Sequence, residues 1–359
     1  MNGKVKAAIG VAMTVASVAG AGGTAVADTG ADTADRRSGQ VLFHDEFRGG
    51  FDTAQTWQLG SAKTATGQTL PQGDGVITAG RRGITVVPTG TNPVTGRPAF
   101  AATTDQNATG FGGGTGDHLK WVAQPRRSSA NGVPIPDTGA LVCSSKLSVQ
   151  ADYVNQHPFG GAVADPQTDP RLASATLISV DHTTHTVANL TVTNGEIHAV
   201  YERLPIPGST YAAYHFSVPV AKRTPGRADN LEIKFDQGGQ RVTWLVNGKD
   251  VLSTDRIGTL AFDRKYLRLD HGGTPEQVRA SSVQCGLGTG NLLDGGGGVK
   301  DRDKRGLVRL GKEENFYYKP SQGAPAQQAF LDDSSLERNR LWGQGVTLNV
   351  RSFDMRYVK

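Results

Sequence analysis

Residues 175–204 read ATLISVDHTTHTVANLTVTNGEIHAVYERL, and this stretch decides the fold. Three runs within it, 175–180, 186–193 and 196–204, are rich in β-branched and apolar residues and have the length of strands. Asn194-Gly195 separates the last two runs, and Asn-Gly is the strongest short signal of a β-hairpin. The stretch therefore predicts three successive antiparallel strands.

Similar strand patterns extend in both directions from this stretch. They cover residues 41–47, 75–87, 118–123, 141–154, 211–218, 231–236, 241–246 and 346–358. Further hairpin turns are expected at residues 237–240 and at Asn247-Gly248. Helix signals are few, and a capping box at Ser334 and Glu337 predicts one short helix. Because strands do not alternate with helices, the sequence predicts an all-β fold, an antiparallel two-sheet β-sandwich with at most one or two short helices.

Glycine is unusually abundant, at 47 of 359 residues, which predicts many turns. Two long turn-rich insertions, residues 88–117 and 286–330, are expected to lie over one rim or face of the sandwich, where functional surfaces often sit. Residues 286–298 are interpreted as a glycine-rich loop. Gly306 and Lys312 imitate a phosphate-binding loop, but Glu313 stands where a Ser or Thr is needed, so no nucleotide is expected.

The N-terminus has the features of a secretory signal. Lys4 and Lys6 precede an apolar run at 7–21, and Ala25-Val26-Ala27 supplies a cleavage site. The sequence therefore predicts a signal peptide at 1–27, a flexible lead-in at 28–40 and a single secreted domain at 41–359. The apolar run is too rich in Gly and Ala to favour a membrane anchor. A net charge of +5, spread along the chain, gives no reason to expect nucleic acid, and a monomer is expected.

Cys143 and Cys285 are the two cysteines of the chain. In an exported protein two cysteines are expected to pair, and this pair would disfavour the unfolded chain by about 4–5 kcal/mol through loop closure. Two buried free thiols are the alternative.

Three segments carry a family resemblance. FHDEF at 43–47, followed by Asp52 and Trp57, resembles the opening of laminarinase-type β-glucanases; VTWLVNGK at 242–249 resembles a later strand and turn, and FDMRYV at 353–358 the closing strand. The segments occur in the family's order. The chain thus resembles the concanavalin A-like lectin/glucanase superfamily and, more narrowly, uncharacterised secreted actinobacterial proteins of this type. The resemblance implies a jelly roll over about residues 41–359.

The strand expected to carry the family's chemistry departs from the family's pattern. Laminarinase-type enzymes carry E-x-D-x-x-E or E-x-D-x-E, whereas here His198 follows Glu196 at the helper position and the next carboxylate is Glu202. In an extended strand the Cα atoms of Glu196 and Glu202 lie about 20 Å apart. Catalytic carboxyl pairs need about 5 Å or about 6.5–9.5 Å, so the standard dyad is not expected.

Glu196, His198 and Glu202 nevertheless share one face of the strand and are the candidate catalytic residues. His198 would act as acid or base beside Glu196. An ordinary polar, solvent-facing strand is the alternative.

Other candidate sites are weaker. Trp121 and Tyr201 are candidate ligand-binding residues, because sugars stack on aromatic faces. Asp270 and His271, at a strand end beside Arg268, form a second candidate ligand-binding cluster.

Two metal hypotheses arise. Asp181, His182 and His185 have H-x-x-H spacing, which suits either a transition metal or a polar loop. Asp354 matches a position where the resemblance implies structural calcium. No other cofactor is expected.

Three functions remain open. The first is a secreted non-catalytic glycan-binding or surface-associated β-sandwich, whose partner is an extracellular polysaccharide. The second is a polysaccharide-acting glycoside hydrolase or lyase with a rearranged active site. The third is a structural secreted protein without a ligand. Fold alone cannot choose between them.

Overall fold

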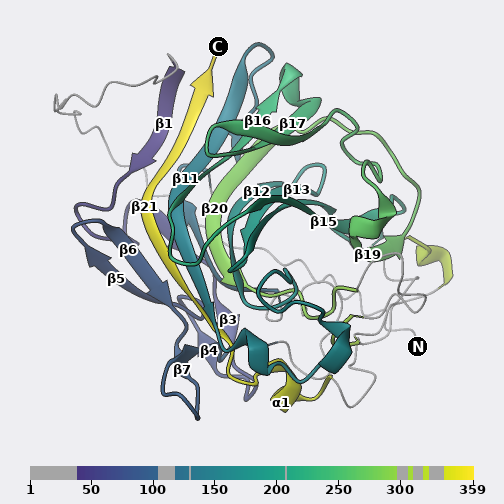
Figure 1. Ribbon diagram of the computed structural model, residues 1–359. Helices are drawn as coiled ribbons and strands as arrows, with labels where there is room; N and C mark the ends of the chain where they lie inside the picture. The colour runs from purple at the N-terminus through teal and green to yellow at the C-terminus, as the bar shows by residue number, and fades with distance from the viewer. Residues whose placement is uncertain are drawn as a thin grey trace, which may run out of the picture. The chain divides into compact units, whose positions relative to one another are not determined.

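The alternating segments of the sequence form two antiparallel sheets that pack face to face, as expected (Figure 1). The computed structural model describes residues 39–103, 118–128, 131–206, 208–296, 306–309, 318–322 and 335–359. Arg37–Lys359 form one compact unit. The expected signal peptide lies outside the described residues, and the expected lead-in ends earlier than predicted, because Gly39 already begins a strand.

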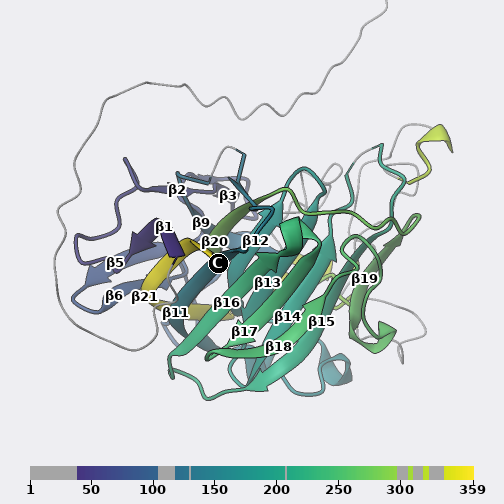
Figure 2. The same ribbon diagram turned by 90° about the horizontal axis from the view of Figure 1, so that it is seen from above.

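Sheet A forms one layer of the sandwich, and Figure 2 shows its strands from above. Its order is β18 (Lys249–Thr254), β17 (Arg241–Val246), β16 (Asp229–Asp236), β11 (Ala140–Asp152), β21 (Gly345–Val358), β6 (Gly83–Val87) and β5 (Val76–Gly80), with β1 (Gly39–Asp45) paired to β21.

Sheet B is strongly curved, and sheet A packs against its convex side (Figure 1). Its order is β19 (Leu267–Gly272), β15 (Ala213–Lys222), β14 (Glu196–Arg203), β13 (Thr186–Val192), β12 (Ser174–Asp181), β20 (Ser282–Gly290), β9 (Leu119–Pro125) and β2 (Trp57–Leu59), with β10 (Val133–Pro134) paired to β20.

Short elements complete the described chain. They are the two-stranded pairs β3 (Ala62–Lys63) with β4 (Thr69–Leu70) and β7 (Gly90–Thr91) with β8 (Pro98–Ala99), the helix α1 (Glu337–Arg340), and several 3₁₀ turns. The helix confirms the expected short element, but its N-cap is Leu336, which makes no side-chain cap. Ser334, the expected cap, lies outside the described residues.

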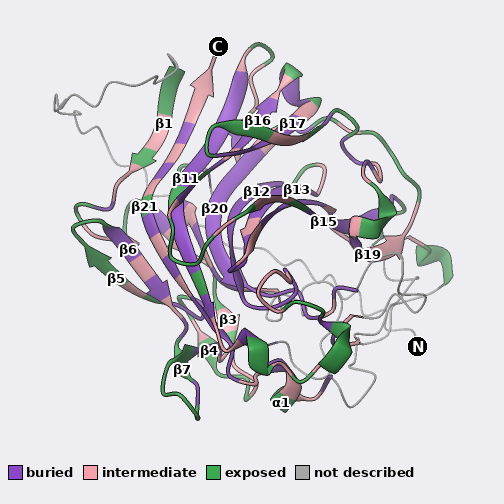
Figure 3. Cartoon of the chain, viewed as in Figure 1, coloured by how far each residue is buried: buried purple, intermediate pink, exposed green. Residues whose placement is uncertain are grey.

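The core lies between the two sheets. Leu147 of β11, Trp244 of β17 and Leu177 of β12 are fully buried, as period-two alternation requires of the inward face. Each such side chain contributes about 1.5–3 kcal/mol by leaving water. Figure 3 shows this burial along β11 and β20, while β1 and β5 are exposed at the edge.

A disulfide crosses this core. Cys143 of β11 and Cys285 of β20 are both fully buried, and their Cα atoms lie 6.2 Å apart. The bond joins the central strand of sheet A to an inner strand of sheet B and confirms the predicted pairing.

The interpretation of residues 286–298 as a loop is wrong at its start. Gly286, Gly288 and Gly290 belong to β20, between β12 and β9. They alternate with Leu287 and Thr289, which face the core side with Cys285. A Cβ on Gly290 would lie 1.8 Å from the His118 carbonyl oxygen, and one on Gly286 would lie 2.6 Å from that of Ala123. These glycines therefore let the backbones of β20 and β9 approach closely on the curved face.

We expect the Cys143→Ala/Cys285→Ala variant to lose about 5 kcal/mol of unfolding free energy, because the bridge closes a loop with a separation of 142 residues. Guanidinium unfolding without reductant measures the loss. Wild type reduced with dithiothreitol should match the variant, and equal stability of oxidised and reduced wild type would contradict the prediction.

Gly290→Ala should destabilise the protein by about 1–3 kcal/mol, since the added methyl group meets backbone that must shift. Gly49→Ala is the matched control, because nothing lies within 4 Å of the position its Cβ would take. Thermal unfolding compares the two variants. Similar stability in both would show that β20 and β9 do not need the close approach.

Candidate functional site

The face of sheet B turned away from sheet A carries the sequence-predicted catalytic residues. We call it the concave face, and define it by the following residues. They are Asn189 and Thr191 of β13, Glu196, His198, Val200 and Glu202 of β14, and His215 and Ser217 of β15. The residues between them on β14, including Ile197 and Ala199, are buried in the core. Alternation thus places the three candidates on one face, as predicted.

Glu196 and His198 are neighbours on this face. One Glu196 carboxylate oxygen lies 2.5 Å from Lys222 Nζ, and the other lies 3.5 Å from His198 Nε2. The Glu196 side chain is 16% exposed and His198 only 3%. The carboxylate is therefore paired yet accessible from outside.

His198 is held in its neutral form. Its Nε2 donates to the Thr168 carbonyl oxygen at 3.0 Å, and its buried Nδ1 has no hydrogen-bond partner in the described part of the chain. Burial lowers the pKa of His198 to about 4, although Glu196 and the Thr168 carbonyl act in the opposite direction. At neutral pH its Nδ1 is therefore a hydrogen-bond acceptor.

Glu202 forms a second carboxylate–imidazole pair, which the sequence analysis missed. Register places Glu202 opposite His215 of β15, and a Glu202 carboxylate oxygen lies 3.3 Å from His215 Nδ1. Both residues lie in predicted strands, but pairing depends on a register shift between Ile197 and His198 that no local pattern reveals. Glu196 and Glu202 stand at opposite ends of β14, as expected from about 3.3 Å per residue.

A buried charge cluster lies behind His198. Asp169 forms a two-contact pair with Arg171, with Nη2 to Oδ2 at 2.6 Å and Nε to Oδ1 at 2.9 Å. Arg268 is close enough to influence the pKa of both Asp169 and His198. No local sequence pattern pointed to Asp169 or Arg171.

The side chains of Asp270 and His271, predicted to form one cluster, have different partners. Asp270 pairs with Arg264, with Nη2 to Oδ2 at 2.7 Å. His271 instead lies near Asp294, which contacts His118 Nε2 at 2.5 Å. Burial raises the pKa of Asp294, but His118 and His271 lower it by more, so that the pKa lies below its usual value. The contact between Asp294 and His118 was not anticipated from the sequence.

The two predicted aromatic ligand-binding residues lie in the core. Trp121 is 0% exposed and Tyr201 1%. The Tyr201 hydroxyl accepts from Tyr214 and Gly258 and donates to the Arg256 carbonyl. Packing between the sheets covers both rings, so in this conformation neither offers a face to a sugar.

The residues around Asp354 do not fit calcium. Its Oδ1 accepts from Arg356 Nη1 at 2.6 Å and its Oδ2 lies 3.2 Å from His44 Nδ1. Burial raises the pKa of Asp354, but His44 and Arg356 lower it by more, so that the pKa lies below its usual value. A guanidinium beside the carboxylate would repel a divalent cation.

The H-x-x-H segment also divides. His182 Nε2 lies 2.8 Å from the Gln284 side-chain oxygen, and His185 Nδ1 lies 3.1 Å from the Tyr211 hydroxyl. Within the described ranges, no group of three or more His, Cys, Asp or Glu residues is arranged to hold a metal. Those ranges also hold no helix long and apolar enough to cross a membrane.

A family model and a curated protein match the sequence. A model described as "Family of unknown function (DUF6081)" matches residues 44–359. "Uncharacterized protein L829" of Acanthamoeba polyphaga mimivirus is 25% identical over 238 residues, which is 50% of this chain and 54% of that protein. The chain thus spans about half the length of the curated relative that it matches.

Solved glucanase structures are similar to the chain at low identity. An endo-1,3-β-glucanase from Streptomyces sioyaensis is 10% identical, with 92% of this chain and 100% of that chain covered and a TM-score of 0.43. The catalytic domain of a laminarinase from Thermotoga petrophila is 8% identical, with 90% and 99% covered and a TM-score of 0.39. Such similarity concerns the fold alone.

The low pKa of His198 predicts a loss of stability in acid. The unfolded chain takes up a proton near pH 6.5 and the folded chain only near pH 4, so stability is full above pH 6.5 and falls between these values. The loss should reach about 3 kcal/mol at pH 4.

Urea unfolding of wild type and His198→Gln across this range measures the effect. The variant should show a flatter pH profile, and His182→Gln controls for the loss of one imidazole. Parallel profiles for wild type and His198→Gln would refute the assignment.

Proposed function

We propose that the chain, which belongs to the family of unknown function DUF6081, binds an extracellular polysaccharide. Binding takes place on the concave face of sheet B, without cleavage. The observation that carries the proposal is the polar row along β14 and β15, in which Glu196 and Glu202 are each accessible and already paired. Carboxylates and imidazoles in such a row accept and donate the hydrogen bonds that sugar hydroxyl groups require. Charge-assisted bonds of this kind are the stronger ones.

The positions of the carboxylates favour binding over cleavage. Glu196 and Glu202 lie six residues apart on one strand, about 20 Å by strand geometry, so they cannot flank one glycosidic bond at about 5 Å or about 6.5–9.5 Å. Each is also already engaged, Glu196 with Lys222 at 2.5 Å and Glu202 with His215 at 3.3 Å.

The buried disulfide supports a place outside the reducing cytoplasm. Cys143 and Cys285 are paired in the core, and such bonds persist in oxidising compartments. We propose a secreted monomer, with no nucleic acid or nucleotide partner.

One observation favours the second candidate, a polysaccharide-acting hydrolase or lyase with a rearranged site. Glu196 with His198 and Glu202 with His215 are carboxylate–imidazole pairs at 3.5 and 3.3 Å, and such pairs can serve acid–base chemistry. In this case one pair would act alone, without a carboxylate dyad.

Affinity electrophoresis against β-glucans, galactans and uronic-acid polymers tests the proposal, with reducing ends measured in parallel. We expect wild type to be retarded by at least one polymer without releasing sugar. Glu196→Gln/Glu202→Gln should weaken that retardation about tenfold or more, because two charge-assisted hydrogen bonds are lost.

Glu232→Gln is the matched control. Glu232 is paired with Arg356 at 2.9 Å on the outer side of sheet A, so its loss should leave binding unchanged. Sugar release that disappears in Glu196→Gln would establish the enzymatic candidate instead. Retardation by no polymer would leave the structural, ligand-free role.

A further inference from the structure

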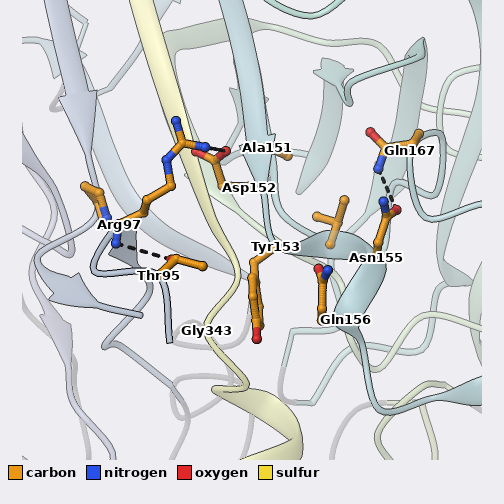
Figure 4. A pocket seen from close by; sticks show the side chains of 11 residues that line it. Thr95, Arg97, Ala151, Asp152, Tyr153, Asn155, Gln156, Gln167 and Gly343 are labelled. Carbon is orange, nitrogen blue, oxygen red and sulfur yellow. Dashed lines mark hydrogen bonds and ion pairs between the residues drawn. The ribbon is translucent and has the colours of Figure 1, made fainter. Parts of the chain in front are cut away.

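A pocket lies away from the concave face, where β11 leaves sheet A. Its volume is about 270 Å³. Figure 4 shows its walls, which come from the turn between β7 and β8, the end of β11 with the 3₁₀ turn Val154–Gln156, and the single residues Gln167 and Gly343. Four segments far apart in the sequence therefore build one cavity.

The charges of the pocket are balanced within it. Arg97 and Asp152 are the charged residues of the lining, and Arg97 Nη1 lies 2.7 Å from Asp152 Oδ1. This pairing leaves no net charge to attract an anion, and a single engaged carboxylate cannot hold a metal ion. The pocket thus favours a neutral ligand.

The other polar side chains offer hydrogen bonds. Gln167 Nε2 donates to Asn155 Oδ1 at 2.6 Å, which fixes the direction of the Asn155 amide. In the described part of the chain no hydrogen bond uses Asn155 Nδ2, the side-chain amide of Gln156 or the Tyr153 hydroxyl. Donors and acceptors therefore line the cavity together with one aromatic ring (Figure 4).

Tyr153 has an unusual backbone conformation at this place. Its φ is 63°, in the left-handed region that a bulky residue adopts only under strain. Trp342 Nε1 donates to the Tyr153 carbonyl at 3.2 Å, and the ring lies beside Gly343, where a Cβ would be 3.5 Å from Tyr153 Cδ1. Strain that persists because the surroundings hold it is typical of ligand sites.

We propose that this pocket is a second binding site, and that it takes one neutral sugar ring. Sugar hydroxyl groups both donate and accept, which matches the amides of Asn155 and Gln156, while the ring of Tyr153 offers apolar surface for the C–H face of the sugar. A volume of about 270 Å³ lies just below the usual ~300–1,000 Å³ of small-molecule sites, so it suits a single ring, such as a chain end or a one-residue branch.

This site goes beyond the concave-face proposal and does not depend on it, because different side chains select the ligand. One chain segment nevertheless contacts both sites. Gln167 lines the pocket, and the carbonyl of the next residue, Thr168, holds His198.

Saturation-transfer NMR of the full chain with methyl glycosides of glucose, galactose, mannose and N-acetylglucosamine tests the site. We expect at least one glycoside to bind wild type with a Kd in the millimolar range. Asn155→Ala/Gln156→Ala should weaken that binding about tenfold or more, since both side chains are exposed and their loss removes hydrogen bonds without disturbing the core.

Gln68→Ala/Asn230→Ala is the matched control, because it removes the same two amides at exposed positions elsewhere. It should bind as wild type does. Tyr153→Phe, which keeps the ring and removes the hydroxyl, should weaken binding by a smaller factor. Binding of no glycoside at tens of millimolar, or unchanged binding by Asn155→Ala/Gln156→Ala, would overturn the proposal.

The result is independent of the concave-face experiment. Glu196→Gln/Glu202→Gln should keep its monosaccharide binding even where it loses polysaccharide. If the polysaccharide proposal fails and the pocket proposal holds, glycosides still bind and only the pocket variant loses them.

Discussion

Close backbone contact between β20 and β9 is the constraint on which sheet B depends. Gly286 and Gly290 occupy positions where a side chain would meet the neighbouring carbonyl groups. On the other side of β20, Cys285 is bonded to Cys143 of sheet A. The glycines on one face of β20 thus allow the close approach of β9 in the curved sheet B. Cys285 on the other face links β20 covalently to sheet A. The concave face, with its row of polar side chains on β13 to β15, follows from that curvature.

Much of this architecture could be predicted from the sequence. The strand from Glu196, the disulfide and the buried Trp244 follow from alternation, from cysteine number and from phase. β20 (Ser282–Gly290) was not among the predicted strands; glycine is depleted in strands, and the need for Gly286 and Gly290 comes from a neighbouring backbone. Local propensity carries no record of such a neighbour.

The candidate site residues were likewise predictable only where local alternation determines their position. Alternation alone places Glu196, His198 and Glu202 on one face, but His215 joins Glu202 only through a strand register set by a bulge. The pocket was beyond prediction, since Arg97, Asp152 and Gln167 meet only in the folded chain. Trp121 and Tyr201 were attractive as aromatic residues in strands, yet the inward phase of each strand buries them.

The segment that carries Gln167 and Thr168 makes hydrogen bonds both at the pocket and at the concave face of sheet B. Gln167 donates to Asn155 at the pocket and accepts from Asn194 Nδ2 at 2.7 Å, while Thr168 accepts from His198. A displacement of this segment alters hydrogen bonds at both places together. If occupancy of the pocket displaces this segment, thermodynamic reciprocity requires the factor by which it changes affinity on the concave face to equal the factor in the reverse direction.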